Sequence, residues 1–238
     1  MTSEDVEYYY TNISLNRDTL DLYLVRTSIL NALKSCLSQF KGRFLDVGCG
    51  HMVYKPFITS APSQVTEYIG MDLQVSSIYD TQKADLVWDG KVIPLPADSI
   101  DSAMATEVFE HCPDINMVLA EIYRVLKPGG VLFFTIPFIW PLHDVPYDEY
   151  RYTPFSLERH FRKAGFSFID LKPLGGWDAS LAQMIGLWTL RRPMKAHKRN
   201  LMAVLAKPII KYLIKNDKRP QKYIESTMIT GIYGFIIK

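Results

Sequence analysis

Three consecutive apolar runs of this sequence end in residues suited to binding a nucleoside. The run at 43–47 is followed by Gly48-Cys49-Gly50, and glycines at such a turn let the backbone bend sharply and approach a ligand. Asp72 closes the next run, where a carboxylate can accept hydrogen bonds from ribose hydroxyls. Asp89 follows the third run and can accept from an adenine amino group. The two glycines alone are also compatible with a tight turn that binds nothing, but the three sites together favour a nucleoside.

Short buried strands alternating with helices must position these residues. Expected strands lie at 43–47, 65–71, 84–88, 100–106, 131–136, 166–171 and 228–237, and expected helices at 15–37, 114–126 and 155–164. Lys127-Pro128-Gly129-Gly130 should end the second of these helices, and Gly165 the third. The alternation predicts βαβ units around a parallel sheet, which is an α/β fold.

A basic insertion separates the last two expected strands. It has helical patterns at 179–190 and 201–214, the second interrupted by Pro208. Residues 191–222 carry 11 basic side chains and one acidic side chain, whereas residues 1–190 carry 15 basic and 23 acidic side chains. Three interpretations stay open: a face that meets anionic lipid or a phosphorylated substrate, a packing cap with solubilising lysines, or a surface for RNA.

Composition excludes several other classes of protein. With 238 residues, 48% of them apolar and 22% charged, the chain is expected to form one globular domain rather than a disordered or fibrous one. Three cysteines without paired spacing argue against a disulfide scaffold or zinc module. The first ten residues lack the features of a secretory signal, and the apolar runs are too short to span a bilayer. We therefore expect a cytoplasmic protein, with peripheral contact at the inner face of the membrane through 191–222 as one open interpretation.

Five segments in order resemble the class I S-adenosylmethionine-dependent methyltransferases. They are 45–50, Asp72, Asp89, 106–111 and 124–130, within a resemblance that covers residues 40–175. His51-Met52-Val53 departs from the pattern, because many members have a small residue or a further glycine there. Val53 also stands where a dinucleotide site would have a third glycine, which argues against a nicotinamide cofactor.

The resemblance implies a Rossmann-like, doubly wound sheet of seven strands, the last antiparallel and inserted beside the sixth. It implies S-adenosyl-L-methionine as the cofactor. We expect a helical segment at 1–40 and a methyltransferase domain at 41–238, with 174–227 as a basic helical cap over the acceptor site. The implied cofactor-binding residues are Asp46, Gly48, Cys49, Gly50, Asp72, Leu73, Asp89, Gly90 and Glu107.

Methylation of a hydroxyl requires that its proton leave, and histidine is the natural base near neutral pH. His111 follows the fourth strand and His143 follows the fifth, so the candidate catalytic residues are His143, His111 and Asp144. For His111, an anchoring role in its loop is an equal alternative. Adjacent His143 and Asp144 make a poor metal-ligand set, so no metal is expected.

The loop after the fifth strand supplies the candidate acceptor contacts. They are Tyr147, Tyr150, Arg151 and Tyr152, although Arg151 could instead pair with Asp148 or Asp144 to brace the loop. The stretch 137–153 resembles a subset of methyltransferases encoded with bacterial surface-polysaccharide enzymes. That resemblance implies a small-molecule or glycan acceptor, lipid-linked or nucleotide-linked, with a hydroxyl or an amine as the methylated group.

Two other functions remain open at this stage. One is an RNA methyltransferase, which the absence of a recognised RNA-binding module disfavours. The other is a cofactor-binding scaffold subunit without chemistry of its own. The sequence does not indicate an oligomeric state.

Overall fold

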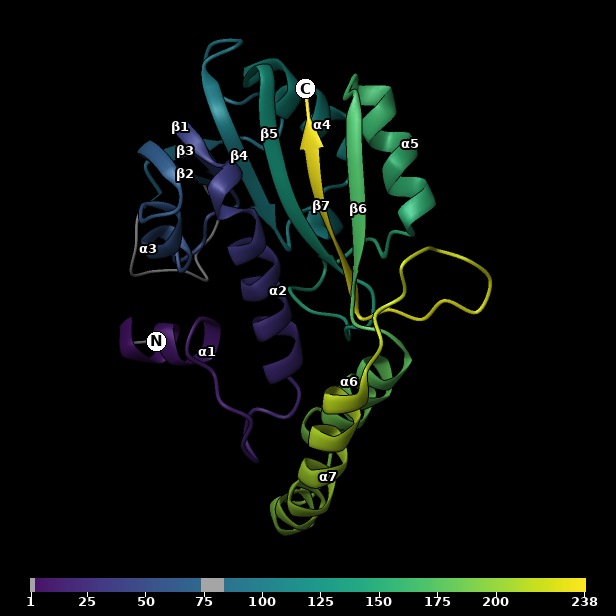
Figure 1. Cartoon of the computed structure of the whole chain (residues 1–238). Helices are drawn as coiled ribbons and strands as arrows, with labels where there is room; N and C mark the ends of the chain where they lie inside the picture. Colours follow the sequence, from purple (N-terminus) through teal and green to yellow (C-terminus); the bar gives the residue numbers. More distant parts are fainter. Residues whose placement is uncertain (1–2, 74–83) are drawn as a thin grey trace. The chain divides into compact units, whose positions relative to one another are not determined.

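The computed structural model in Figure 1 describes residues 3–73 and 84–238, with side chains from residue 7 onward. The chain divides into two compact units. The helical unit comprises Met1–Asn31, Pro137–Pro141 and Lys172–Ile232, and the sheet unit comprises Ala32–Ile136, Leu142–Leu171 and Tyr233–Lys238.

The seven expected strands form one sheet in the order β3-β2-β1-β4-β5-β7-β6. Their bounds are β1 Lys41–Val47, β2 Gln64–Leu73, β3 Leu86–Trp88, β4 Ile100–Thr106, β5 Leu126–Pro137, β6 Phe168–Leu174 and β7 Gly231–Ile237. Strand β1 pairs in parallel with β2 and β4, β2 with β3, and β4 with β5. The predicted α/β class and strand number are confirmed.

The last strand is antiparallel and lies between β5 and β6, as the resemblance implies. At one end of β7, Lys238 N donates to Gly130 O over 3.0 Å. At the other end, Phe138 N, just after β5, donates to Thr230 O, just before β7, over 2.9 Å. Strands β5 and β7 therefore run in opposite directions. Ser167 N donates to Ile237 O over 3.2 Å on the β6 side, and the predicted insertion of β7 beside β6 is confirmed.

The buried parts of β1 and β5, residues 44–47 and 131–136, are largely apolar because both faces of a parallel sheet are covered. Phe44 and Phe133 are fully buried, and each ring lies edge-on to the ring of Phe40, with centroids 5.1 and 6.3 Å apart. Phe134, also on β5, packs on Phe161 with ring centroids 4.9 Å apart. These aromatic rings hold the central strands rigidly, and the loops at the strand ends depend on that rigidity.

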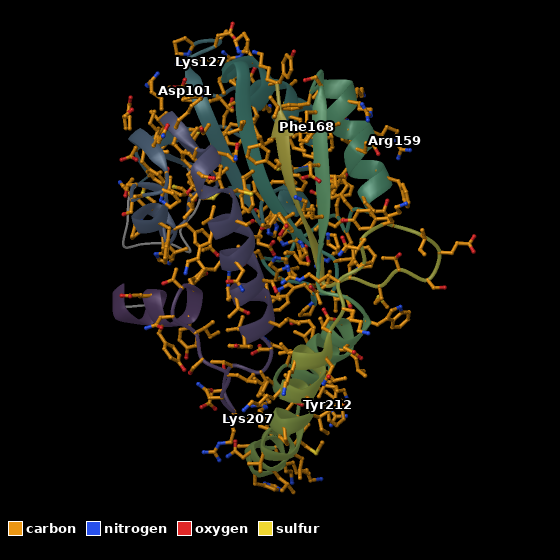
Figure 2. The ribbon with its side chains drawn as sticks, viewed as in Figure 1. Asp101, Lys127, Arg159, Phe168, Lys207 and Tyr212 are labelled. Atoms are coloured by element: carbon orange, nitrogen blue, oxygen red, sulfur yellow. The ribbon has the colours of Figure 1, made fainter. Side chains whose placement is uncertain are left out.

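A polar cluster joins β1, β4 and β5 at the edge where β4 begins. Asp101 accepts hydrogen bonds from Lys127 Nζ over 2.7 Å and from Arg43 N over 2.9 Å. Figure 2 shows Asp101 and Lys127 close together at the start of β4. The chemistry-bearing loops lie at the other edge, so this cluster serves the fold.

Two helices of the sheet unit match their sequence patterns. Helix α4, Ile115–Val125, begins at Asp114, whose carboxylate caps it by accepting from Asn116 N and Met117 N. Helix α5, Pro154–Ala164, begins in a capping box between Thr153 and Ser156 and ends at Gly165 with φ of +104°. Helix α3 spans Lys55–Ile58, and the short 3-10 turns η1 and η2 span Leu37–Gln39 and Phe109–His111.

The expected helix at 15–37 starts later than its apolar pattern, because helix α2 spans Tyr23–Cys36. Side chains in the preceding segment bind the backbone locally: Asn16 accepts from Asp18 N over 2.8 Å, and Thr19 accepts from Asn16 N over 3.0 Å. Such bonds compete with helix formation. Helix α1, Ser3–Tyr10, lies within the helical segment expected at 1–40, ahead of the periodic pattern at 15–37.

The basic insertion contains helices α6, Trp177–Leu190, and α7, Ala196–Asn216, which lie side by side in the helical unit (Figure 1). The expectation that Pro208 interrupts the second helix is wrong. Buried Ala203, Ala206, Ile210 and Leu213 lie on both sides of Pro208 and pack in one core with Leu20 and Ala182. That packing offsets the hydrogen bond lost at proline. In the described ranges 3–73 and 84–238, no helix is long and apolar enough to cross a membrane.

Candidate active site

The loop after β1 is tied to the end of β2. Gly48 N and Cys49 N donate to Met71 O over 2.8 and 3.1 Å, and Gly50 N donates to Asp72 Oδ2 over 2.9 Å. Gly48 has φ of +68°, and a Cβ at that position would lie 2.6 Å from Val108 Cγ2. Only glycine fits at this position, because Val108 fills the space that a Cβ would need. The loop follows the carboxyl end of β1, the edge at which α/β folds bind ligands.

Asp72 fixes this loop, and its carboxylate oxygens can still accept further hydrogen bonds. Besides the bond from Gly50, its Oδ1 accepts from Leu73 N over 2.7 Å. Each carboxylate oxygen has two lone pairs, so both oxygens can still accept from a ribose. Residues 74–83, which follow, lie outside the described part of the chain.

Asp89 has a local partner at the end of β3. Its Oδ1 accepts from Lys91 N and Val92 N over 2.8 and 2.9 Å, and these bonds lower the pKa of the carboxyl. Gly90, with φ of +78°, allows the turn. The structure therefore uses one oxygen of Asp89 to shape the turn, and its contact with adenine remains a prediction.

Asp46 near the end of β1 is a buried carboxylate that is only half satisfied. Its Oδ2 accepts a hydrogen bond from the Tyr68 hydroxyl, while its Oδ1 has no hydrogen-bond partner among the described residues. Burial raises the pKa of Asp46 to about 7, although the Tyr68 bond opposes this. An orphaned buried acceptor of this kind fits the ammonium group of an amino-acid cofactor.

Two glutamates follow β4. Glu107 has φ of +54°, and its Oε1 accepts from Thr135 Oγ1 over 2.8 Å. The Glu110 side chain is fully buried, and neither carboxyl oxygen has a hydrogen-bond partner among the described residues. Burial, reinforced by the charge of Glu107, raises the pKa of Glu110 well above its usual value. His111 Nε2 lies 3.8 Å from Glu110 Oε1.

The loop after β5 carries a histidine held by a braced carboxylate. His143 Nδ1 lies 3.1 Å from Asp148 Oδ2. Arg151 donates from both terminal nitrogens to the two oxygens of Asp148, over 2.6 and 2.8 Å, and holds the pKa of that carboxyl at about 2. Burial lowers the pKa of His143. Of the two carboxylates considered as partners of Arg151, Asp148 and Asp144, the structure shows an ion pair with Asp148.

Backbone bonds dock this loop onto the end of β4. Glu149 N and Tyr150 N donate to Glu110 O over 3.0 and 3.1 Å. His111 Nδ1 lies 3.1 Å from Tyr147 O. As a result, the rings of His111 and His143, far apart in the sequence, lie with centroids 4.8 Å apart. The structure thus brings the two candidate histidines into one cluster.

The other predicted residues lie around this cluster with different exposures. Asp144 is exposed, has φ of +46°, and accepts from Tyr147 N through its backbone oxygen, so it is placed at the turn of the loop. Tyr147 and Tyr150 are exposed, whereas Tyr152 is buried beside Tyr150, with ring centroids 5.3 Å apart. Cys49 is buried, and burial raises the pKa of its thiol.

Sequence reasoning missed Tyr68 and Glu110 as site residues, and it gave Asp148 only as a possible partner of Arg151. Glu110 had a signal, since it directly precedes His111, and Asp148 lies three residues before Arg151. Nothing in the sequence around Tyr68 points to Asp46, because that pairing depends on the register between β1 and β2.

Known proteins resemble this chain in part of its sequence and in its fold. Residues 45–134 match the family model described as a methyltransferase domain. The chain is 30% identical over 132 residues to a malonyl-[acyl-carrier protein] O-methyltransferase of Erwinia billingiae, covering 50% of this chain and 51% of that protein. It is 28% identical over 111 residues to a fatty-acid O-methyltransferase of Mycolicibacterium smegmatis, covering 44% and 39%. The chain thus spans about half or less of the length of these relatives.

A solved structure extends the similarity in fold over most of the chain. It is an S-adenosylmethionine-dependent methyltransferase of Thermotoga maritima, described as a possible histamine N-methyltransferase, with 18% identity and a TM-score of 0.56 over 89% of this chain and 88% of that one. Residues 45–134 therefore resemble a methyltransferase domain, and the fold of the chain is similar to that of this solved methyltransferase. S-adenosyl-L-methionine is the cofactor that these comparisons support, and the glycine loop, Asp46 and Asp72 fit it.

Proposed function

We propose that this protein is an O-methyltransferase that modifies a hydroxyl group of a lipid-linked acceptor, such as a membrane glycan. When bound, the cofactor would supply a methyl group on a positively charged sulfur, which would keep the electron pair of the carbon–sulfur bond when the acceptor oxygen takes the methyl group. The backbone of Gly48 and Gly50 would lie against the cofactor, Asp72 would accept from its ribose, and Asp46 would accept from its ammonium group.

The observation that carries this proposal is the pair of histidines that the loops after β4 and β5 bring together. A hydroxyl acceptor must lose its proton, and a positioned imidazole can take it. His143 is held through Nδ1 by Asp148, which leaves Nε2 for a proton. Asp148 is engaged by both terminal nitrogens of Arg151, so it orients the imidazole rather than exchanging protons itself.

The histidine pair also favours a hydroxyl acceptor over a carboxylate acceptor. The relatives named above act, by their names, on malonyl-[acyl-carrier protein] and on fatty acids. A carboxylate is already ionised at neutral pH, since its ordinary pKa is about 4. Such an acceptor needs no base, and the His111–His143 pair would have no role in it. We therefore favour a hydroxyl, and the resemblance of the 137–153 loop to glycan-associated methyltransferases supports a sugar.

Helix α7 supports an acceptor at a membrane, because it has two apolar faces. One face packs in the core of the helical unit. The other, which we call the outer stripe, consists of side chains that are each 49 to 68% exposed: Leu201, Val204, Leu205, Ile209 and Tyr212. Their three- and four-residue spacing places them along one side of the helix.

Basic side chains border the outer stripe. Lys207, Lys211 and Lys215 recur every four residues along α7, and Figure 2 shows Lys207 and Tyr212 on this helix. An exposed apolar stripe flanked by lysines is the pattern of a helix that lies in the plane of an anionic membrane surface. This arrangement favours the lipid alternative over a merely solubilising cap, for which no exposed stripe is needed.

A labelled-methyl assay tests the function directly. The purified chain is incubated with methyl-labelled cofactor and, separately, a lipid-linked sugar, a fatty acid, a malonyl thioester, an amine and bulk RNA. We expect label in the lipid-linked sugar, in an ether that resists mild alkali. His143→Ala should lower turnover on that acceptor by about 10²–10⁴-fold without changing cofactor affinity.

Other outcomes would replace the proposal. Label that mild alkali releases as an ester would indicate a carboxylate acceptor, and label in RNA would indicate the RNA alternative. Tight cofactor binding with no labelled product from any acceptor would favour a scaffold subunit.

A further inference from the structure

We infer that Glu110, His111 and His143 form a binding site for one divalent transition-metal ion. One ligand atom from each of the three residues can be chosen so that all lie within 4.8 Å of one another. Glu110 and His111 come from the turn after β4, and His143 comes from the loop after β5. The cluster therefore exists only in the folded chain, and two separate segments supply its ligands.

Glu110 is the observation that points to a ligand. Its side chain is fully buried, and both of its oxygens are without a hydrogen-bond partner among the residues that the structure describes. Burying a carboxyl group in this way is costly unless something satisfies it. A cation between Glu110 and His111 Nε2, which lie 3.8 Å apart, would satisfy it.

Both imidazoles are already held as metal-binding imidazoles usually are. The Nδ1 atom of His111 lies 3.1 Å from the backbone oxygen of Tyr147, and the Nδ1 atom of His143 lies 3.1 Å from Asp148 Oδ2. When Nδ1–H donates to a carbonyl or carboxylate, the ring is fixed and Nε2 carries the free lone pair. Arg151 holds Asp148 in turn, so the supporting contacts extend beyond the ligands.

The ligand set indicates the kind of ion. Two imidazoles and one carboxylate suit Zn²⁺ and neighbouring first-row ions, whereas Mg²⁺ and Ca²⁺ prefer oxygen ligands. Ligand atoms around a tetrahedral ion with bonds of about 2.0–2.1 Å lie roughly 3.4 Å apart, so atoms that are up to 4.8 Å apart must approach by up to about 1.4 Å on binding. The expectation of no metal considered His143 with Asp144, whereas the structure groups His143 with Glu110 and His111.

Three protein ligands leave one coordination position of the ion open. The role given to that position here rests on the proposed function. A hydroxyl oxygen in that position becomes far more acidic, so its proton can be lost to solvent while both histidines serve as ligands. Without the ion, His143 Nε2 would take the proton directly. The ion thus decides how the same cluster deprotonates the acceptor.

Binding is tested without cofactor or acceptor, on the chelator-treated chain of residues 1–238 freed of any polyhistidine tag. Zn²⁺ is titrated by calorimetry and Co²⁺ by its visible absorption. We expect one ion per chain, with affinity reduced at least about 100-fold in Glu110→Gln and His143→Ala. Asp148→Asn, which disturbs only a supporting contact, should reduce it by about 10–100-fold. The matched control is His197→Ala. His197 is exposed on α7 and is not part of the cluster, so this variant should leave the affinity unchanged.

Circular dichroism and cofactor affinity establish that each variant is folded; if Glu110→Gln is not, His143→Ala and Asp148→Asn decide the question. The inference is overturned if no ion binds stoichiometrically, if the cluster variants bind as the native chain does, or if Co²⁺ shows the charge-transfer band of a thiolate ligand. If the ion binds but no hydroxyl acceptor is methylated, the site stands and the proposed function fails.

Discussion

The Asp72 carboxylate ties Gly50 and Leu73 in place, and under the proposed function its remaining lone pairs accept from a ribose. We expect Asp72→Ala to weaken cofactor binding by about 1.5–3 kcal/mol, the range for losing hydrogen bonds to a charged group. Calorimetric titration with S-adenosylmethionine measures this. Asp72→Asn, which keeps one acceptor oxygen, should lose less, and unchanged affinity in a folded Asp72→Ala chain would remove Asp72 from the ribose role.

Asp46 should make the stability of the chain depend on pH. Its pKa rises from an ordinary 3.8 when unfolded to about 7 in the fold, so the folded state holds a proton that the unfolded state releases between these values. The stabilising contribution of neutral Asp46 is fully present below the lower pKa and is lost as pH rises to the upper one. Over that window the loss approaches about 1.4 kcal/mol per pH unit.

Denaturant unfolding from about pH 5 to about pH 8 measures this dependence. Asp46→Asn cannot ionise, so the native chain should lose stability relative to the variant as pH rises through the window. A difference between the two chains that does not change with pH would show that Asp46 is charged throughout.

At the scale of elements, helix α4 depends on the N-terminal cap that Asp114 provides. Asp114 Oδ1 accepts from Asn116 N over 3.0 Å and from Met117 N over 3.2 Å, which satisfies two of the free amides in the first turn. We expect Asp114→Ala to lower the free energy of unfolding by about 1 kcal/mol, measured by denaturant titration. Asp114→Asn should retain most of the cap, and an equal loss in both variants would mean that charge rather than capping is responsible.

The loop that carries His143 is an element without regular structure, and its order comes from its contacts. Backbone bonds to Glu110 O, the Arg151–Asp148 pair and the capping box of α5 hold it at both ends. These contacts explain how a loop can present an imidazole in a fixed orientation, which acid–base chemistry and metal binding both require.

At the scale of the whole molecule, the outer stripe and its lysines should direct the chain to anionic membranes. Each lysine near such a surface contributes on the order of 1 kcal/mol. We expect Lys207→Gln, Lys211→Gln and Lys215→Gln together to reduce binding to anionic vesicles by roughly 100-fold, and added salt to weaken the native chain similarly. Sedimentation with vesicles of anionic and of neutral lipid measures both effects.

Two further variants separate charge from apolar burial in this prediction. Leu205→Ser with Ile209→Ser leaves every charge in place and should still weaken vesicle binding, because both side chains belong to the outer stripe. Cofactor affinity should not change in any of these chains. If the native chain ignores anionic vesicles at low salt, the stripe is not a membrane surface.

The sequence by itself determined the sheet, the cofactor loops and the ends of α4 and α5. Buried parallel strands need continuous apolar runs, turns at strand ends need glycine, and helix ends need caps, so each of these features is written into a few neighbouring residues. Where local side-chain bonds competed with the apolar pattern, as at Asn16 and Thr19, the predicted helix began too early. The prediction that Pro208 interrupts the second helix of the insertion was wrong because tertiary packing overrode a local signal. Contacts within the helical unit offset the hydrogen bond that proline removes.

Only the tertiary structure decided which residues meet. Tyr68 reaches Asp46 through strand register, and His143 reaches His111 and Glu110 because the loop after β5 docks onto the end of β4. The outer stripe likewise could not be told from the inner face of α7 until one of them was covered. Sequence spacing sets the direction of a side chain along its own element, whereas contacts between elements depend on how the whole sheet and its loops pack, and that is a property of no single segment.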